Sequence, residues 1–396
     1  MRAQFDIIVS GGGIAGMTAA AAFGSAGYSV LCVDPSPPVI AEADPGSDLR
    51  STAFLHPSVK VLEQAGLWER FSAHAMPLQV MRIVDAGGEQ PEPRVSHDFN
   101  AADISDQPFG WNLPNWMLKR EISARLAELP NVTFRPGVAT TRLTTRETAA
   151  LVGLSDGTTV EARLLIAADG RNSPMRQALG IGVRTTRFGQ KALAFAVTHP
   201  VPHENVSTEI HRSGGPFTFV PLPDRDGLPC SAIVWMETGP EVARLQALPV
   251  AEFESEMNTR SCGLFGPLRL ASRLTVWPII SQIAERFVGE RTALMAEAAH
   301  VVPPIGAQGL NMSLADLTAL MDLATPDTLG SPAMLAAYQR KRYPDVALRV
   351  AGVGMLNRAS MIHAQPLRDA RARMLDAMYS AAPVRRALMQ MGIGVR

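Results

Sequence analysis

The sequence predicts an α/β protein in which a parallel-sheet domain is interleaved with an antiparallel-sheet domain and followed by C-terminal helices. A β-α-β pattern with a glycine turn opens the chain. Strand-type runs between Pro/Gly turns occupy the middle of the chain, from about residue 184 to residue 283. From Ala333 onward the pattern is helical to the end.

Length and composition describe an ordinary globular chain. With 396 residues, 46% of them hydrophobic, it can bury a large core and is long enough for two or three domain-sized units. Its cysteines, Cys32, Cys230 and Cys262, form no CxxC pair and stand beside no histidine at ligand spacing. We therefore expect no disulfide framework, no metal site and a reducing cytoplasm. The net charge of zero argues against nucleic acid as a partner.

The opening unit is predicted to form a strand at Phe5–Val9, a small-residue helix ending near Gly27 and a second strand at Tyr28–Val33. Ile7–Val33 contains no charged residue and is long enough to span a bilayer. Its six glycines and the preceding Asp6 make a membrane helix or a signal peptide the weaker interpretation.

A Gly-x-Gly-x-x-Gly motif lies between the first strand and the helix. In this position the motif indicates a Rossmann-like nucleotide-binding domain, whereas the pattern alone is weak evidence. Gly11 permits a tight turn, Gly13 lets the backbone approach a pyrophosphate, and Gly16 allows helix and sheet to pack closely. Asp34 ends the second strand, where it can accept hydrogen bonds from ribose hydroxyls. The expected cofactor-binding residues here are Gly11, Gly13, Ile14, Ala15, Gly16 and Asp34. The motif alone does not separate NAD from FAD.

The next segments alternate in type. "HPSVKVLEQAGLWERF" suits a short helix with a turn at Gly66, and "WMLKREISARLAELP" a helix stopped by Pro130. "ARLLIAADG" is a buried strand that enters a loop, and "KALAFAVTH", "FTFVPLP" and "CSAIVWM" are strands, the last two joined by "DRDGL". After "RTALM" a strand–loop–helix unit returns.

These patterns predict that each domain is discontinuous. The nucleotide-binding domain takes residues 1–75, 111–183 and 286–345, the substrate domain takes 76–110 and 184–285, and basic C-terminal helices take 346–396. No internal repeat or low-complexity segment interrupts this order.

A second motif, "ADGRNSPMRQALG", places Asp169-Gly170 directly after the buried strand. Combined with the opening motif and the late "MAEAAHVVPPIGAQGLN", it resembles the flavoprotein aromatic hydroxylases, the FAD-dependent monooxygenases of the para-hydroxybenzoate hydroxylase type. The resemblance covers nearly the whole chain. It is closest to the branch that hydroxylates polyprenylated phenols in ubiquinone biosynthesis, because of "DLRSTAFLHPSVKVLEQAGLW", "GQKALAF" and "HVVPPIGAQGLNMSLAD".

The resemblance implies a set of FAD contacts. Arg50 is expected near the flavin, Glu297 at the ribityl chain, and the loop from Pro304 with its following helix against the isoalloxazine ring. A helix beginning near Gly309 would direct its positive end at the flavin and stabilise the charge that develops on reduction. The further residues expected at the cofactor are Arg50, Arg120, Asp169, Gly170, Glu297, Pro304, Gly306, Ala307, Gln308, Gly309, Leu310 and Asn311.

The late motif departs from the family pattern at two places. The usual Gly-Asp is Ala296-Glu297, and the usual Gly-Gln-Gly is Ala307-Gln308-Gly309, with Gly306 displaced by one position. Glutamate keeps the carboxylate but adds one methylene, and alanine at 296 is expected to exclude conformations that only glycine tolerates. We expect FAD to be retained; a scaffold with an empty flavin site is the alternative.

Several side chains allow two interpretations. No catalytic residue is identified; His300 and Pro304 are the candidates in front of the flavin, and a packed, hydrogen-bonded role is favoured for His300 over a proton shuttle. Arg120 either faces the pyrophosphate or lies on a solvated helix face. Trp235 and Trp277 belong to the sheet core or wall the substrate pocket.

The activity that the resemblance implies is a single-component monooxygenase. NAD(P)H, binding transiently, would reduce FAD, dioxygen would form a flavin C4a-hydroperoxide, and one oxygen atom would pass to the ring of a prenylated phenol in ubiquinone biosynthesis. An FAD hydroxylase of a small soluble phenol and a non-catalytic scaffold of the ubiquinone-biosynthesis assembly are the alternatives.

Charge is uneven along the chain. From Arg340 to Arg396 there are eleven Lys or Arg against three Asp, a net charge of +8, so the rest of this neutral chain carries −8. Six methionines accompany the arginines. This tail suits contact with the inner face of the cytoplasmic membrane or with a ubiquinone-biosynthesis protein. Helices packed on the FAD domain with solvated arginines explain it equally well.

Overall fold

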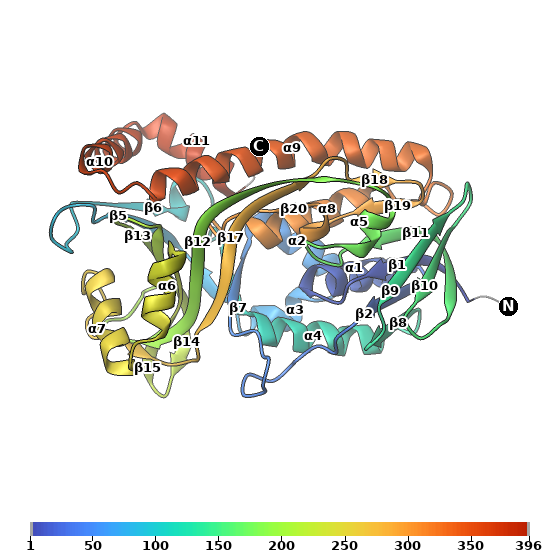
Figure 1. The fold of residues 1–396 in the computed structure, drawn as a ribbon, viewed down its shortest axis with the longest axis horizontal. Coiled ribbons are helices and arrows are strands. Elements are labelled where there is room, and N and C mark those ends of the chain that lie inside the picture. The colour runs from blue at the N-terminus through green and yellow to red at the C-terminus, as the bar shows by residue number, and fades with distance from the viewer. Residues whose placement is uncertain (1–2, 394–396) are drawn as a thin grey trace.

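The computed structural model of this protein describes residues 3–393 and places two parts side by side, joined by the long strands β12 (Val183–Thr198) and β17 (Thr275–Ala284). Figure 1 shows the nucleotide-binding part at the right and the antiparallel sheet at the left. The predicted α/β class is confirmed.

The first part is built on a mainly parallel sheet with the order β18-β19-β11-β1-β2-β8, to which β10 and β9 add antiparallel strands. The central strands are apolar on both faces because helices cover the sheet, as the buried run of β1 shows. Its strands are β1 (Gln4–Ser10), β2 (Val30–Asp34), β8 (Val132–Pro136), β9 (Thr140–Thr145), β10 (Ala150–Leu154), β11 (Thr159–Ala167), β18 (Val288–Gly289) and β19 (Thr292–Leu294).

Helix α1 (Ile14–Ser25) lies against α4 (Asn115–Glu128) and α8 (Gln308–Leu323). Its run of alanines is fully buried, which lets the neighbouring helices approach closely. The uncharged stretch that is long enough to span a bilayer thus folds as β1, α1 and β2. Among residues 3–393, no helix combines the length and apolar character required to cross a membrane.

The second part is a nine-stranded sheet with the order β20-β17-β12-β15-β14-β13-β5-β6, with β16 paired to β12. Strands β5 and β6, from much earlier in the chain, join it beside β13. Its further strands are β5 (Val80–Asp85), β6 (Val95–Asn100), β13 (Val206–His211), β14 (Pro216–Arg225), β15 (Leu228–Thr238), β16 (Arg269–Leu270) and β20 (His300–Val301).

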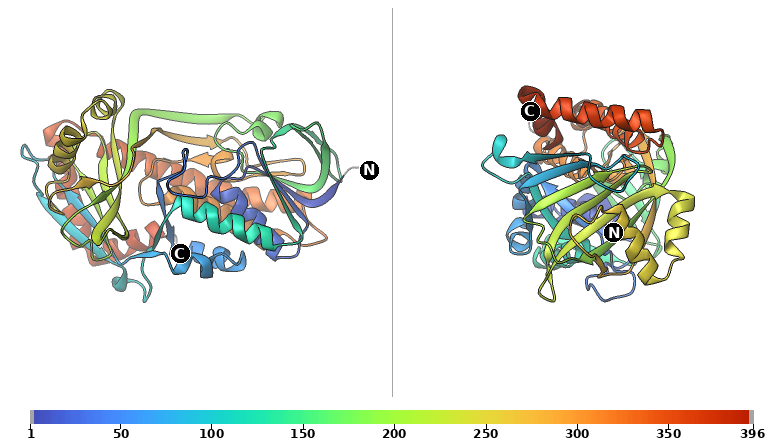
Figure 2. Two further views of the ribbon diagram at one scale, coloured as in Figure 1. Left: turned by 90° about the horizontal axis from the view of Figure 1, so that it is seen from below. Right: turned by 90° about the vertical axis from the view of Figure 1, so that its left-hand side faces the viewer.

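One face of this sheet is covered by α6 (Gly239–Gln246) and α7 (Val250–Arg260), and the other faces the nucleotide-binding part (Figure 2). The expectation of strands only from about residue 184 to 283 is therefore wrong for 239–260. Val242, Leu245, Phe253 and Met257 are buried along these helices at helical spacing, a pattern hidden among the neighbouring strand-type runs.

The remaining short elements connect the two parts. A three-stranded sheet with the order β3-β7-β4 contributes residues to the lining of the cavity described next. These elements are β3 (Ser51–Leu55), β4 (Met76–Leu78), β7 (Gly110–Pro114), α2 (His56–Gln64), α3 (Trp68–Ser72), α5 (Pro174–Ala178) and the 3-10 turns η1 (Ala101–Asp103) and η2 (Ala296–Ala298).

Three helices end the chain. Helix α9 (Pro332–Ser360) begins at the N-cap Ser331 and runs along both parts, contacting α8, β17 and β18 (Figure 1). Helices α10 (Gln365–Ser380) and α11 (Ala382–Ile393) cover the β5–β6 edge of the antiparallel sheet.

Candidate functional site

The glycine turn after β1 has the geometry that its sequence predicts. Gly11 has φ +110°, and a Cβ there would lie 2.3 Å from the carbonyl oxygen of Ala168. A Cβ at Gly16 would lie 1.9 Å from the carbonyl oxygen of Gly11, so helix and turn touch where only glycine fits. A Cβ at Gly13, by contrast, meets nothing within 4 Å, because this residue faces open space.

The N-terminus of α1 is free to bind an anion. Gly13 is its N-cap, and no side chain caps the helix. Asp34 lies beside this end, with Oδ2 accepting from the Gly12 N–H at 2.6 Å and Oδ1 from the Ser36 N–H at 2.8 Å. Two backbone donors thus orient a carboxylate that lines the cavity next to a positive helix end.

The loop after β11 brings a second carboxylate to the cavity. Oδ2 of Asp169 accepts from the Met175 N–H at 3.2 Å, but its Oδ1 is buried without a hydrogen-bond partner among the described residues. Burial raises the pKa of Asp169 above its ordinary value, against hydrogen bonds that lower it. From the same loop, Arg176 donates to the carbonyl oxygen of Ala298 at 2.8 Å and so fixes the late loop.

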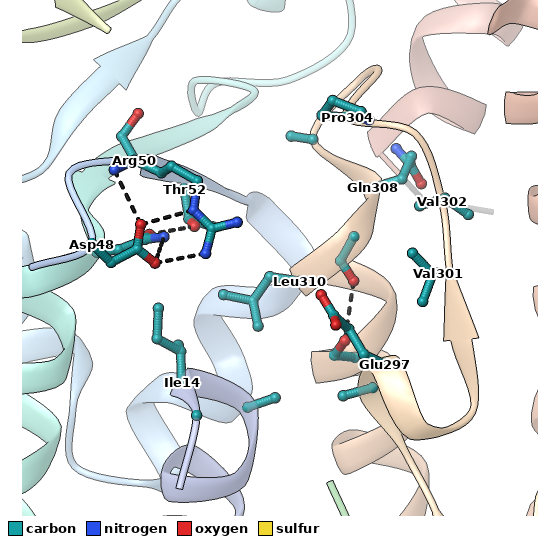
Figure 3. Close-up of a pocket in the computed structure, with 18 of the residues that line it drawn as sticks. Ile14, Asp48, Arg50, Thr52, Glu297, Val301, Val302, Pro304, Gln308 and Leu310 are labelled. Atoms are coloured by element: carbon teal, nitrogen blue, oxygen red, sulfur yellow. Dashed lines mark hydrogen bonds and ion pairs between the residues drawn. The ribbon is translucent and has the colours of Figure 1, made fainter. Parts of the chain in front are cut away.

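Arg50 is held at the cavity by a paired carboxylate (Figure 3). Its Nε and Nη2 each lie 2.7 Å from an oxygen of Asp48, and Asn115 donates to the same carboxylate at 3.0 Å. The hydrogen bond to Asp48 raises the pKa of Arg50, and the charge of Glu297 contributes. Its guanidinium also lies 5.2 Å from the ring centre of Trp277, which belongs to the other sheet.

Glu297 lies across the cavity from Arg50, with its side chain exposed in the cavity (Figure 3). Its neighbour Ala296 has φ +54°, and Ala307, the N-cap of α8, has φ +55°. The expectation that alanine would keep position 296 out of this backbone region is therefore wrong. Alanine adopts the left-handed conformation at a cost of roughly 1–2 kcal/mol relative to the right-handed one, which the surrounding packing must offset.

His300 belongs to a buried charged network. Its Nε2 lies 2.6 Å from Oδ2 of Asp316, whose Oδ1 accepts from Nε of Arg342 at 2.7 Å. The Ala296 N–H also donates to this carboxylate at 3.2 Å. Burial alone would raise the pKa of Asp316, but the charges of His300 and Arg342 lower it. The late loop is thereby tied to α8 and α9, as the packed interpretation of His300 requires.

These segments surround one cavity of about 740 Å³. One end is polar and carries the glycine turn, Asp34, Asp169 and Arg50. The other end lies against β5, β13, β14 and β15 and is mainly apolar. The predicted residues that line it are Gly11, Gly13, Ile14, Ala15, Gly16, Asp34, Arg50, Asp169, Gly170, Glu297, His300, Pro304, Gly306, Ala307, Gln308, Gly309 and Leu310.

Two predicted residues are placed outside the cavity lining. Arg120 donates to Glu121 at 2.9 Å on the solvated side of α4, whereas the adjacent Lys119, which sequence reasoning missed, lines the cavity. Successive residues on a helix point about 100° apart, and the motif could not decide between them. Asn311 is buried and uses both ends of its amide on the backbone and on Ser58, so it fastens α8 to β3.

The two tryptophans occupy different environments. Trp277 lines the cavity, which is the pocket-wall interpretation. Trp235 is buried between the sheet and α7, where it packs on Phe217 and Phe253, which is the core interpretation. Alternation along a strand decides which face each ring takes.

Residues 4–351 match the family described as "FAD binding domain". The chain belongs to this family. It is 32% identical over 394 residues to ubiquinone hydroxylase UbiL of Rhodospirillum rubrum, covering 98% of this chain and 89% of that protein. It is 25% identical to 3-demethoxyubiquinol 3-hydroxylase of Escherichia coli, covering 98% of each.

Solved structures share the fold at lower identity. PqsL of Pseudomonas aeruginosa in complex with 2-aminobenzoylacetate has a TM-score of 0.78 at 22% identity, covering 94% of this chain and 100% of that one. p-Nitrophenol 4-monooxygenase PnpA of Pseudomonas putida has a TM-score of 0.77 at 18% identity, covering 100% of both chains. The predicted resemblance is confirmed, and this protein is an FAD-dependent monooxygenase.

The polar end of the monooxygenase cavity suits FAD. The open position at Gly13 and the uncapped α1 match a pyrophosphate, and the carboxylate of Asp34 lines the same end of the cavity, where it can accept from ribose hydroxyls. At the far side, α8 directs its uncapped N-terminus at the same space through Gln308 and Gly309.

Proposed function

We propose that this monooxygenase hydroxylates the aromatic ring of a polyprenyl phenol in ubiquinone biosynthesis, with NAD(P)H as the reductant. The observation that carries the proposal is the continuity of the cavity, which runs from the FAD-binding glycine turn to an apolar sheet face without an intervening wall. The names of the two relatives above support the substrate class.

The reaction requires one reductant and one oxygen molecule for each ring. Dioxygen, NAD(P)H and a proton react with the ring C–H; one oxygen atom becomes the new ring hydroxyl, and the other leaves as water while NAD(P)H is oxidised to NAD(P)⁺. FAD, when bound, supplies the activation of dioxygen. The residues of this chain bind the cofactor at the polar end, hold the ring at the apolar end and exclude water from the space between them.

The apolar end is suited to a prenylated ring. Leu55, Leu78, Val80, Met81 and Phe109 line it. Met81 and Phe109 also pack in the small core under α10 and α11, so the C-terminal helices form the outer cover of the substrate end. We therefore expect a longer prenyl chain to bind more tightly, by about 25 cal/mol for each Å² of apolar surface that it buries.

We also propose that the three helices that end the chain, α9, α10 and α11, contact the inner face of the cytoplasmic membrane. Exposed apolar side chains are concentrated there: Leu348, Met355, Leu356, Leu367, Met374, Val384 and Met391. Exposed arginines stand among them at positions 340, 373 and 386. Apolar contacts with acyl chains and attraction to anionic headgroups would act together while the substrate is exchanged.

Two experiments test the function. The visible absorption spectrum of the purified protein, before and after addition of FAD, should show flavin bands; a colourless protein that ignores FAD would favour a scaffold. Hydroxylation should then be assayed by mass spectrometry with NADH or NADPH and a 2-farnesylphenol, against phenol itself. Product from farnesylphenol supports the proposal, and turnover of phenol alone would replace it with a hydroxylase of small soluble phenols.

The membrane proposal is tested by flotation with phosphatidylglycerol vesicles. Wild-type protein should float with anionic vesicles and less with neutral ones, and Met355→Ser together with Leu356→Ser should reduce flotation. The control Leu228→Ser removes a comparably exposed leucine on a hairpin away from these helices. Equal flotation of all variants, or none, would contradict the proposal and leave a protein partner for this surface.

A further inference from the structure

The apolar end of the cavity contains one charged side chain on the antiparallel sheet among the described residues that line it, Glu209 of β13. Oε1 of Glu209 lies 2.7 Å from Nε2 of His211, two residues further along the same face. Both side chains are largely buried, with relative exposures of 15% and 17%. A carboxylate placed in an apolar pocket loses hydration, so its presence there calls for a polar partner.

The strand register places Glu209 on the sheet face that lies toward the nucleotide-binding part. Glu209 is opposite Thr218 of β14, and Thr218 is opposite Val234 of β15, so the three share one face of the sheet. Val234 belongs to the same hydrophobic cluster as Val302 and Ile305 of the loop that leads into α8. Two strand spacings, roughly 10 Å, therefore separate Glu209 from the strand that touches this loop. A phenol ring fits within such a span.

The contact with His211 holds the carboxylate in place and leaves one oxygen free. His211 approaches Oε1, and Oε2 has no partner among the described residues. The Nδ1 of His211 is buried without a hydrogen-bond partner, so among the described residues the imidazole interacts with Glu209 alone. Ser207 and Thr218 line the same part of the cavity with hydroxyls, but neither takes up a proton near neutral pH.

We propose that Glu209 is a catalytic residue that binds the phenolic hydroxyl of the substrate and accepts its proton, with His211 as its positioning residue. This inference rests on the proposed function. The phenol O–H bond breaks, the proton forms a bond to a carboxylate oxygen, and the electron pair stays on the phenol oxygen. The ring becomes more electron-rich and accepts the oxygen atom more readily; the proton returns to the phenol oxygen of the product.

Other titratable groups near this face are already paired. His211 is opposite Asp85 of β5, which is bound to Arg94 and Arg371. His97 of β6 lies one strand beyond and is bound to Asp376 of α10. Across the cavity stand Glu297, Arg50 and Asp48. If a pH effect on kcat disappears when Glu209 alone is changed, that effect is due to Glu209 and not to these other groups.

The test uses the FAD-loaded enzyme with 2-farnesylphenol and with its methyl ether, which has no proton to lose. Glu209→Gln should lower the rate of phenol hydroxylation by about 10²-fold or more. It should also remove the low-pH limb of the kcat profile, while FAD content and turnover of the ether stay near wild type. Glu209→Asp should recover part of the rate. Glu252→Gln, an exposed change on α7 behind the sheet, is the control.

A measurement on the wild type keeps the inference testable if the variant fails to fold. The rate of phenol hydroxylation by the wild type, compared in H2O and D2O, should show a solvent isotope effect that turnover of the methyl ether lacks, because only the phenol gives a proton to the carboxylate. Equal solvent isotope effects for the phenol and its ether, or equal rates for wild type and Glu209→Gln, would overturn the role of Glu209. A wild type that hydroxylates no phenol would instead refute the proposed function itself.

Discussion

Replacement of Asp316 by Asn tests whether the buried network holds the late loop. Asp316 has no exposed surface and accepts from Arg342, His300 and the Ala296 N–H. Asn keeps the shape but removes the charge, so that buried Arg342 keeps only its ion pair with Asp345. Breaking one side of a buried ion pair costs about 3–5 kcal/mol. With an unfolding entropy of roughly 0.8 kcal/mol per kelvin for a chain of this size, Tm should fall by about 4–6 °C.

The chain offers a matched control on the same two helices. Asp322 of α8 pairs with Lys341 of α9 at 2.9 Å, but both side chains are half exposed. Asp322→Asn should cost about 0–1 kcal/mol, because solvent screens the pair. Thermal unfolding followed by circular dichroism at about pH 7 compares the variants. Equal shifts in Tm for Asp316→Asn and Asp322→Asn would refute the reasoning.

The same network predicts a pH dependence. The folded-state pKa of Asp316 is lowered from its ordinary value of 3.8, so its contribution to stability is complete above that value. The contribution is lost as the pH falls from 3.8 through the lower folded-state pKa. In acid, the difference in Tm between wild type and Asp316→Asn should therefore shrink.

Four further substitutions test the cofactor end. Ala296→Gly and Ala307→Gly each remove an alanine from the left-handed backbone region, while glycine loses more conformational entropy on folding. Each should therefore raise the free energy of unfolding, measured with urea, by about 0.5–1 kcal/mol. A lower free energy of unfolding would show that this backbone is not strained. Gly13→Glu should abolish FAD retention, measured as the flavin absorbance of purified protein, whereas Gly352→Glu on the outside of α9 should not; unchanged flavin content in the former would refute the pyrophosphate site. Glu297→Ala should weaken FAD by about 1–3 kcal/mol if the carboxylate accepts from the ribityl chain, and an equal affinity in fluorescence titration would remove it from that contact.

The local elements that position the cofactor end were predictable from the sequence, because each depends on neighbouring residues. The apolar strands around the glycine turn, and the glycines at positions 11, 13 and 16, have spacings that few other structures satisfy. The helix after the late loop begins at Gln308, next to the predicted Gly309. Helices α6 and α7 were missed because their short apolar patterns resemble the strands around them.

Tertiary structure alone decided which side chains reach the cavity. Sequence spacing could not choose Lys119 over Arg120, nor assign the amide of Asn311 to fastening α8, because both choices depend on what packs against a helix face. Ala296 and Ala307 take a conformation that their own sequence disfavours, since the surrounding contacts outweigh a local cost. As one polar residue in a strand, Glu209 could not be recognised from the sequence. It became a candidate only when strand pairing placed it on the same sheet face as Val234, whose hydrophobic cluster includes the loop before α8.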